Sequence, residues 1–219
     1  MQRTLRRYQV PYNPPPQHPR KSVNALRLLH YISVTQRPAL SKALFRAYWV
    51  EGRDISNSVE LLNIAKENGI AGADKLTEAV FDDTTARKAL EDATGDAIKR
   101  GSFGVPGFWI PEAKWRDFKG EEKRGRFYWG QDRMHFVEAT LLSISGSRDR
   151  RFAPTLRSLL PRCIGLGRLV KKVRVQFWYD FSSPWAFLGW TQLDRLQRTF
   201  GTNLEIEMKP FLLGALFRE

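Results

Sequence analysis

The sequence predicts a mixed α/β protein with an all-helical region ahead of its strands, and three observations carry this prediction. Residues 173–211 have the apolar patterns of a strand, a helix and a second strand, which is typical of a βαβ unit. Residues 83–146 have the patterns of a helix, two strands and a helix, which supplies a hairpin. Residues 22–82 show only helical spacing.

The N-terminal third of the chain is predicted to be a leader followed by helices. Residues 1–21 are basic and proline-rich, so we expect them to be irregular or extended. Ser22 is expected to cap the first helix, which ends before Pro38, and Gly69 closes the third. The leucine and aromatic stripes of these helices are typical of core packing. The predicted helices span residues 22–32, 39–50, 56–68 and 73–80.

The middle of the chain is predicted to carry a hairpin between two helices. A helix at 83–99 precedes a strand at 107–110 and an aromatic strand at 126–129. Residues 112–125 between the strands are charged and are expected to form a loop. A final helix is predicted at 130–144.

The C-terminal part is predicted to be a strand that turns sharply into a helix. The apolar run at 173–181 is expected to be a buried strand, and it stops where Ser183 is suited to cap a helix and Pro184 to begin it. The helix ends at Gly201, and a strand follows at 204–211. A helix N-terminus favours an anion such as a thiolate or carboxylate, although a Ser-Pro pair also occurs as a simple cap.

The basic charge of the chain is concentrated in two segments. Of the net charge of +13, residues 1–21 contribute +5 and a basic linker at residues 147–172 contributes +7. The remaining body is nearly neutral, so these segments can bind phosphates non-specifically, but no specific nucleic-acid partner is predicted. The chain has 42% hydrophobic residues but no run of 18 apolar residues, so we expect a buried core and no membrane span.

Cysteine and histidine are rare. Cys163 is the single cysteine and the chain has three histidines, so no disulfide framework, Cys-x-x-Cys motif or metal site is predicted. The N-terminus is basic but lacks the apolar core of a secretion signal, so we do not expect a secreted protein.

Five segments together resemble the DsbA-like thioredoxin superfamily, specifically its branch of kappa-class glutathione transferases and 2-hydroxychromene-2-carboxylate isomerases. They are FWYDFSSPW (177–185), KPFLLGALF (209–217), FRAYWVEGRDI (45–55), GSFGVP (101–106) and FYWGQDRM (127–134). The resemblance implies an α/β fold, a thioredoxin-like sheet with an all-helical insertion. In that family the part resembling 173–219 comes first, whereas here it comes last, so the fold is expected to be circularly permuted or fragmentary.

The resemblance also implies how the chain is divided. Three explanations of the reversed order stay open: a circular permutation, a fragment of a tandem-repeat protein, and a gene model that fuses the end of one copy to the start of another. The implied parts are a basic leader (1–21), a helical insertion domain (22–82), the C-terminal half of a thioredoxin-like domain (83–146), a basic linker (147–172) and its N-terminal βαβ half (173–219).

The implied chemistry centres on Ser183. Dithiol oxidoreductases of the superfamily carry Cys-Pro-His-Cys where this chain has Ser-Pro-Trp-Ala, so dithiol redox chemistry at this turn is excluded. The resemblance implies that Ser183 is catalytic and donates a hydrogen bond to the thiolate of glutathione, with Pro184 and Trp185 beside the tripeptide.

Three further residues are implied to bind glutathione. Val105-Pro106 resembles the family's cis-proline dipeptide, with Pro106 as the cis-proline and the Val105 backbone paired to the cysteinyl unit. Gln131 and Asp132 resemble the contacts to the γ-glutamyl end. An ordinary trans proline and a simple helix-opening Asp are the alternatives. The family's asparagine after the second strand has no counterpart before Glu219, so the site is expected to be weaker.

The leading hypothesis is therefore a glutathione-dependent transferase or isomerase that uses glutathione and a small electrophile. Kappa-class relatives imply an intracellular protein, cytoplasmic, mitochondrial or peroxisomal, and a homodimer or a strand-swapped dimer is expected. Two alternatives stay open: a catalytically inactive permuted or truncated thioredoxin-like protein, and an adaptor whose basic linker binds acidic partners.

Overall fold

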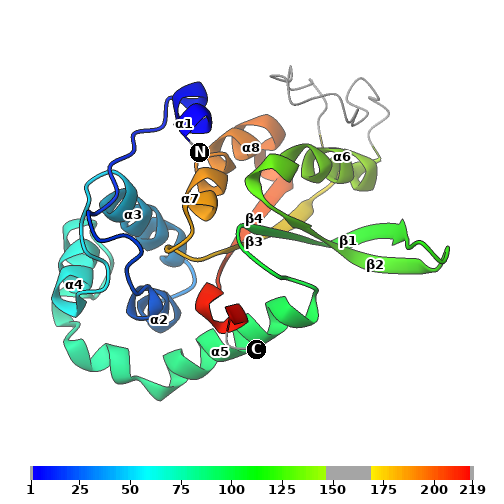
Figure 1. The fold of residues 1–219 in the computed structure, drawn as a ribbon. Helices are drawn as coiled ribbons and strands as arrows, with labels where there is room; N and C mark the ends of the chain where they lie inside the picture. Colours follow the sequence, from blue (N-terminus) through cyan, green and yellow to red (C-terminus); the bar gives the residue numbers. More distant parts are fainter. Residues whose placement is uncertain (1, 147–168, 218–219) are drawn as a thin grey trace.

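Four strands form one mixed sheet in the computed structural model, which describes residues 2–146 and 169–217 (Figure 1). The strand order is β2-β1-β3-β4. β1 pairs antiparallel with both β2 and β3, and β3 pairs parallel with β4. The strands are β1 (Gly107–Arg116), β2 (Glu122–Trp129), β3 (Val173–Tyr179) and β4 (Leu204–Pro210).

Segments far apart in the sequence meet at the centre of this sheet. Phe108 of β1 faces Phe177 of β3, and Gly107 faces Trp178 in the same register. The strand predicted at 173–181 therefore pairs with the strand after Pro106 within one chain. This arrangement is consistent with a thioredoxin-like fold, in which a βαβ unit and a hairpin share a sheet.

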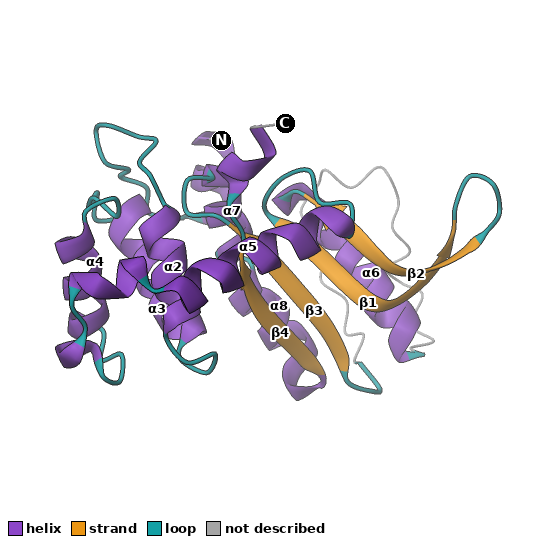
Figure 2. Cartoon of the chain, turned by 90° about the horizontal axis from the view of Figure 1, so that it is seen from below, coloured by secondary structure: helices purple, strands orange, loops and turns teal. Residues whose placement is uncertain are grey.

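Helices cover both faces of the sheet. Helix α5 crosses one face, whereas α6, α7 and α8 lie on the other (Figures 1 and 2). The α2–α4 region lies beside the β4 edge, and α2 contacts β4. The helices around the sheet are α5 (Thr84–Lys99), α6 (Met134–Ser145), α7 (Pro184–Trp190) and α8 (Leu193–Phe200).

The helical region agrees with the predicted pattern except at two places. The leader, expected to be irregular, contains α1, which is held by the buried side chain of Leu5. The helix predicted at 73–80 is instead two short 3₁₀ turns, because Leu76 and Thr77 have extended backbone angles. The elements here are α1 (Gln2–Tyr8), α2 (Val23–Tyr31), α3 (Arg37–Trp49), α4 (Ser58–Glu67), η1 (Ala73–Lys75) and η2 (Glu78–Asp82).

The hairpin is much longer than predicted. Residues 112–125 were expected to form a loop, but β1 continues to Arg116 and β2 begins at Glu122, so only a short turn separates them. The outer part of the hairpin projects beyond the helices (Figure 2), so charged side chains stay solvated on it. Trp115 also donates from Nε1 to the carbonyl of Gly125 at 2.9 Å and lies under the guanidinium of Arg126.

The helix predicted from Pro184 to residue 200 is two helices. α7 ends at Trp190 and α8 begins at Leu193. Between them the Thr191 hydroxyl donates to the Leu188 carbonyl at 2.8 Å, and the Gln192 N–H donates to Gly189 at 3.0 Å. Short turns complete the chain: η3 (Gln131–Arg133), η4 (Gly201–Asn203) and η5 (Leu213–Phe217). The basic linker, Cys163 included, lies outside the described residues up to position 168.

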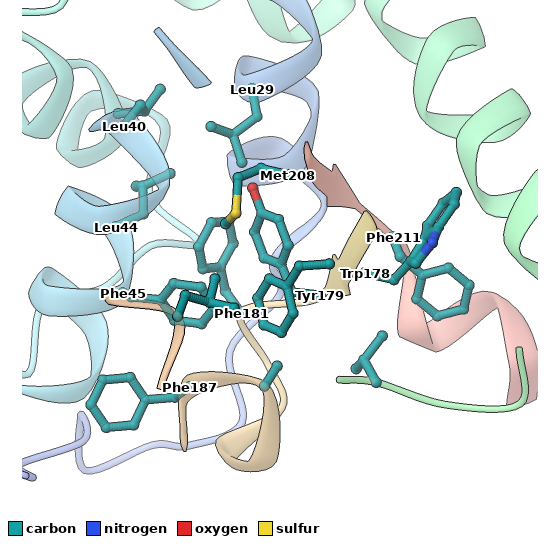
Figure 3. Close-up of a cluster of buried hydrophobic side chains, with 14 of the residues drawn as sticks. Leu29, Leu40, Leu44, Phe45, Trp178, Tyr179, Phe181, Phe187, Met208 and Phe211 are labelled. Carbon is teal, nitrogen blue, oxygen red and sulfur yellow. The ribbon is translucent and has the colours of Figure 1, made fainter. Parts of the chain in front are cut away.

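Aromatic side chains join the helical region to the sheet. Phe45 of α3 packs edge-on against Phe181, with ring centroids 4.8 Å apart, and stacks on Trp190 at 5.3 Å. It also contacts Tyr179 and Phe187, and Phe45, Tyr179, Phe181 and Phe187 meet in one core (Figure 3), against which the partly buried Trp190 packs. The two regions therefore share a hydrophobic core at the end of β3.

We predict that Phe45→Ala lowers the free energy of unfolding by about 3–5 kcal/mol, because it opens a cavity in this shared core. Phe118→Ala is the matched control. Phe118 is 95% exposed at the hairpin turn, so its loss is expected to change stability by no more than about 0.5 kcal/mol. Urea denaturation measures both, and equal losses would contradict the shared core.

We also predict that the protein loses stability in acid through His30. Burial and the positive charge of Arg37 lower the pKa of His30 from 6.5 to about 4. Because the folded state resists protonation, stability is lost as the pH falls through 6.5 toward 4. Allowing for partial exposure, we expect a loss of about 1–2 kcal/mol that His30→Gln removes. Urea denaturation across this range tests it, and an unchanged pH dependence in the variant would refute it.

Candidate functional site

Ser183 caps helix α7 at the end of the turn that follows β3. Its Oγ accepts a hydrogen bond from the Ala186 N–H at 3.1 Å, and Pro184 occupies the first turn of the helix. The same hydroxyl donates to the carbonyl of Val105 at 3.4 Å. Ser183 is 4% exposed. The cap predicted from the sequence is confirmed, and the hydroxyl joins α7 to the loop before β1.

The loop that contains Val105 and Pro106 lies tightly against α7. The Val105–Pro106 peptide bond is cis. Pro106 packs on Gly189 of α7, where a Cβ atom would come within 3.1 Å of the proline ring. The carbonyl of Pro106 also accepts from the Gly130 N–H at 2.9 Å. The loop is therefore fixed from the α7 side and from the η3 side.

Gln131 and Asp132 lie in η3, which contacts α7. The Asp132 carboxylate is exposed and accepts from Arg133 at 2.8 Å. Within the described residues neither side chain hydrogen-bonds to Ser183. The fold thus brings η3 to α7, without a hydrogen bond between the described side chains of Gln131 or Asp132 and Ser183.

Exposed aromatic rings surround this neighbourhood. Trp185, in the first turn of α7, is 44% exposed. Two further exposed rings were not predicted from the sequence: Phe103 and Trp129 are 67% and 45% exposed, with ring centroids 5.0 Å apart. Trp129 lies so close to Gly104 that a Cβ atom there would be 2.6 Å from its Nε1. Both residues occur in the segments that carry the family resemblance, and this was the feature of the sequence that could have indicated them.

Asp180 is the buried carboxylate of the site, and its role was likewise not predicted from the sequence. It is 1% exposed and accepts from the Ser22 hydroxyl at 2.6 Å, the Ser182 N–H at 3.0 Å and the Leu213 N–H at 2.8 Å. Burial raises the pKa of Asp180, whereas these donors act in the opposite direction. The sequence feature that could have indicated this buried carboxylate is a single acidic residue at the end of an apolar strand.

Ser22 corrects an expectation from the sequence. It occupies the N-cap position of α2, but its side chain makes no capping hydrogen bond. The backbone of Ser22 has helical angles (φ −100°, ψ −5°) and not the extended angles of a capping residue, and its hydroxyl donates to Asp180 at 2.6 Å. The residue therefore holds α2 to the turn that carries Ser183.

The described residues contain no cluster of three or more His, Cys, Asp or Glu side chains able to hold a metal ion. Among the helices that the structure describes, none has the length and apolarity to cross a membrane. The chemistry available at the turn is that of a hydroxyl, a helix N-terminus and backbone groups of the Val105 loop.

Comparison with known proteins identifies two similarities. A family model described as "DSBA-like thioredoxin domain" matches residues 1–142 and 174–217. Glutathione S-transferase kappa 1 of Rattus norvegicus is 33% identical over 109 residues, which cover 45% of this chain and 48% of that protein. The alignment thus spans about half the length of this relative.

We predict that Ser183→Ala destabilises the protein by about 1 kcal/mol, because the N–H of Ala186 loses its cap. Ser33→Ala serves as the control: Ser33 is exposed, and its hydroxyl hydrogen-bonds to that of Thr35 at 3.0 Å on the surface, so we expect a change within about 0.5 kcal/mol. Ser183→Asn retains a capping acceptor and is expected to restore most of the loss. Thermal or urea unfolding measures the three variants, and an equal effect of both alanine substitutions would contradict the capping role.

Proposed function

The chain belongs to the family of DSBA-like thioredoxin domains, and from this membership we propose that it is a glutathione-dependent transferase or isomerase in which Ser183 stabilises the glutathione thiolate. The observation that carries the proposal is the position of the Ser183 hydroxyl. It caps α7 and reaches the Val105 carbonyl at 3.4 Å, at the junction of a helix N-terminus and the cis-proline loop.

In the proposed reaction, the Ser183 hydroxyl turns from the Val105 carbonyl to the sulfur. Its present bond to that carbonyl is long, so little free energy is lost when it breaks. The hydrogen bond and the helix dipole lower the pKa of the thiol, which loses its proton to water. The thiolate then attacks an electrophilic carbon: a leaving group departs with the bonding electron pair in a transfer, whereas the sulfur itself is expelled again in an isomerisation, which regenerates glutathione.

The other implied residues have matching roles in this proposal. The backbone of Val105 pairs with the cysteinyl unit, and Pro184 and the exposed indole of Trp185 lie beside the tripeptide. Gln131 and Asp132 bind the γ-glutamyl end, where the exposed Asp132 carboxylate suits an ammonium group.

We propose further that the reversed order of the segments is a circular permutation. Residues 22–82 then form the helical insertion domain, and residues 83–146 and 173–219 the two halves of a thioredoxin-like domain joined by the basic linker. Support comes from the sheet order and from the pairing of β1 with β3 in one chain. The family model also matches the chain in two separate segments.

A catalytically inactive thioredoxin-like protein is the second candidate, and one observation favours it. Ser183 is 4% exposed, and its hydroxyl both accepts from Ala186 and donates to Val105. A hydroxyl that stays so engaged leaves no donor for sulfur.

The deciding experiment is a pH titration of the thiolate absorbance of glutathione in the presence of excess protein. We expect bound glutathione to have a thiol pKa below that of free glutathione. A hydrogen bond to a charged group contributes about 1.5–3 kcal/mol, so Ser183→Ala should raise this pKa by about one to two units.

Ser33→Ala, at an exposed serine, is the control for this titration and is expected to leave the pKa unchanged. If the wild-type protein binds glutathione without lowering the thiol pKa, or does not bind it, the proposal is wrong. In that case the inactive candidate stands.

A further inference from the structure

A cleft of about 780 Å³ lies on another side of the Ser182–Ser183 turn. It is formed by α2, α5, the residues after β3, and η5, which lie near one another in Figure 1. Ser182 lines it, whereas Ser183, Val105, Gln131 and Asp132 do not. The cleft is therefore separate from the residues of the proposed glutathione site.

The lining of this cleft carries an excess of positive charge. The Arg87–Glu91 pair, at 3.1 Å, is neutral as a unit. With Asp180 counted as negative, four cations and two carboxylates line the cleft and leave an excess of two positive charges. Both oxygens of Asp180 already accept hydrogen bonds from the protein. The charged lining residues are Arg20, Lys21, Arg27, Arg87, Glu91 and Asp180.

Two of these cations have buried N–H groups without an acceptor. Arg27 donates from Nη1 to the Phe81 carbonyl at 3.0 Å, but its buried Nε has no partner among the described residues. Arg20 lies 3.5 Å from Asp54 through Nη2, and its Nε is likewise buried and unpartnered. Burying a guanidinium N–H without an acceptor is costly, so these atoms indicate a missing acceptor.

Part of the lining is apolar, although α5 also contributes Arg87, Glu91 and Thr94 to it. Leu90 and Ile98 of α5 and Leu212 after β4 contribute side chains to it. Gly95 of α5 also lines the cleft, and a Cβ atom there would meet nothing within 4 Å. Gly95 therefore leaves open volume in a cleft that both apolar side chains and guanidinium groups line.

We propose that this cleft binds an organic anion with an apolar body, whose carboxylate or phosphate group accepts from Arg27 and Arg20. The apolar body packs against Leu90, Ile98 and Leu212 over Gly95. Arginine suits this role because its planar fork matches a carboxylate or phosphate in geometry. This binding does not depend on glutathione or on Ser183.

Isothermal titration calorimetry of the full chain with octanoate, octyl phosphate and octanol tests the proposal in the absence of glutathione. At least one of the two anions is expected to bind with one-to-one stoichiometry and about tenfold more tightly than octanol. The tighter anion identifies the head group as carboxylate or phosphate. Octanol binding as tightly as both anions would overturn the proposal.

Gly95→Leu is the decisive variant, because it fills the cleft without changing any charge. The open space at Gly95 and the better helix propensity of leucine predict an unchanged or higher melting temperature. Binding of the anion is expected to fall at least about tenfold. Unchanged binding in a folded Gly95→Leu protein would overturn the proposal even where Arg27 variants fail to fold.

Arg27→Gln tests the cation, with Arg116→Gln as a matched control. Both substitutions remove one positive charge and one hydrogen bond to a backbone carbonyl, since Arg116 donates to Gly120 at 3.1 Å on the exposed hairpin. We expect Arg27→Gln to weaken binding about tenfold and Arg116→Gln to leave it unchanged. An equal effect of the two would show that only general charge attracts the anion and would contradict the site.

Discussion

The buried carboxylate of Asp180 is the constraint on which the candidate site depends. A charge that is 1% exposed is tolerated only when donors surround it, and Asp180 receives three of them. They come from Ser22 before α2, from Ser182 in the turn after β3, and from Leu213 in η5. One side chain thus fixes the helical region, the Ser183 turn and the segment after β4 relative to one another.

Packing around Asp180 also fixes the turn after β3 relative to the helical region. The residue before it, Tyr179, pairs through its hydroxyl with Ser41 of α3, and the residue after it, Phe181, packs on Phe45 of the same helix (Figure 3). β3 therefore ends inside a core shared with α3, and the chain has little freedom until α7 begins. The position of Ser183 follows from this burial, because it lies only two residues beyond Phe181.

Local patterns sufficed for most elements, whereas contacts between distant residues were beyond sequence reasoning. Ser183 and Pro184 are adjacent, so the cap of α7 was predictable. Ser22 and Asp180 are 158 residues apart. Local sequence predicts that a serine before a helix is a cap, and it cannot show that the serine donates to a distant carboxylate in the fold. The hairpin was underpredicted for a related reason: charge at 112–125 indicated a loop, and only the fold shows that the strands project into solvent there. The proximity of η3 to α7 was expected from the family resemblance and not from spacing.

The hydrogen bonds of the site differ in strength, and the difference bears on what the site can do. The bonds that fix the turn to Asp180 are 2.6–3.0 Å long and have an acidic acceptor. The bond from Ser183 to Val105 is 3.4 Å long and has a neutral acceptor. Charge-assisted bonds of normal length are about twice as strong as neutral ones, and a bond stretched to 3.4 Å is weaker still. The hydrogen bonds around Asp180 therefore hold the turn rigidly. The Ser183 hydroxyl, at the end of the turn, can exchange its hydrogen-bond acceptor at the lowest cost in free energy.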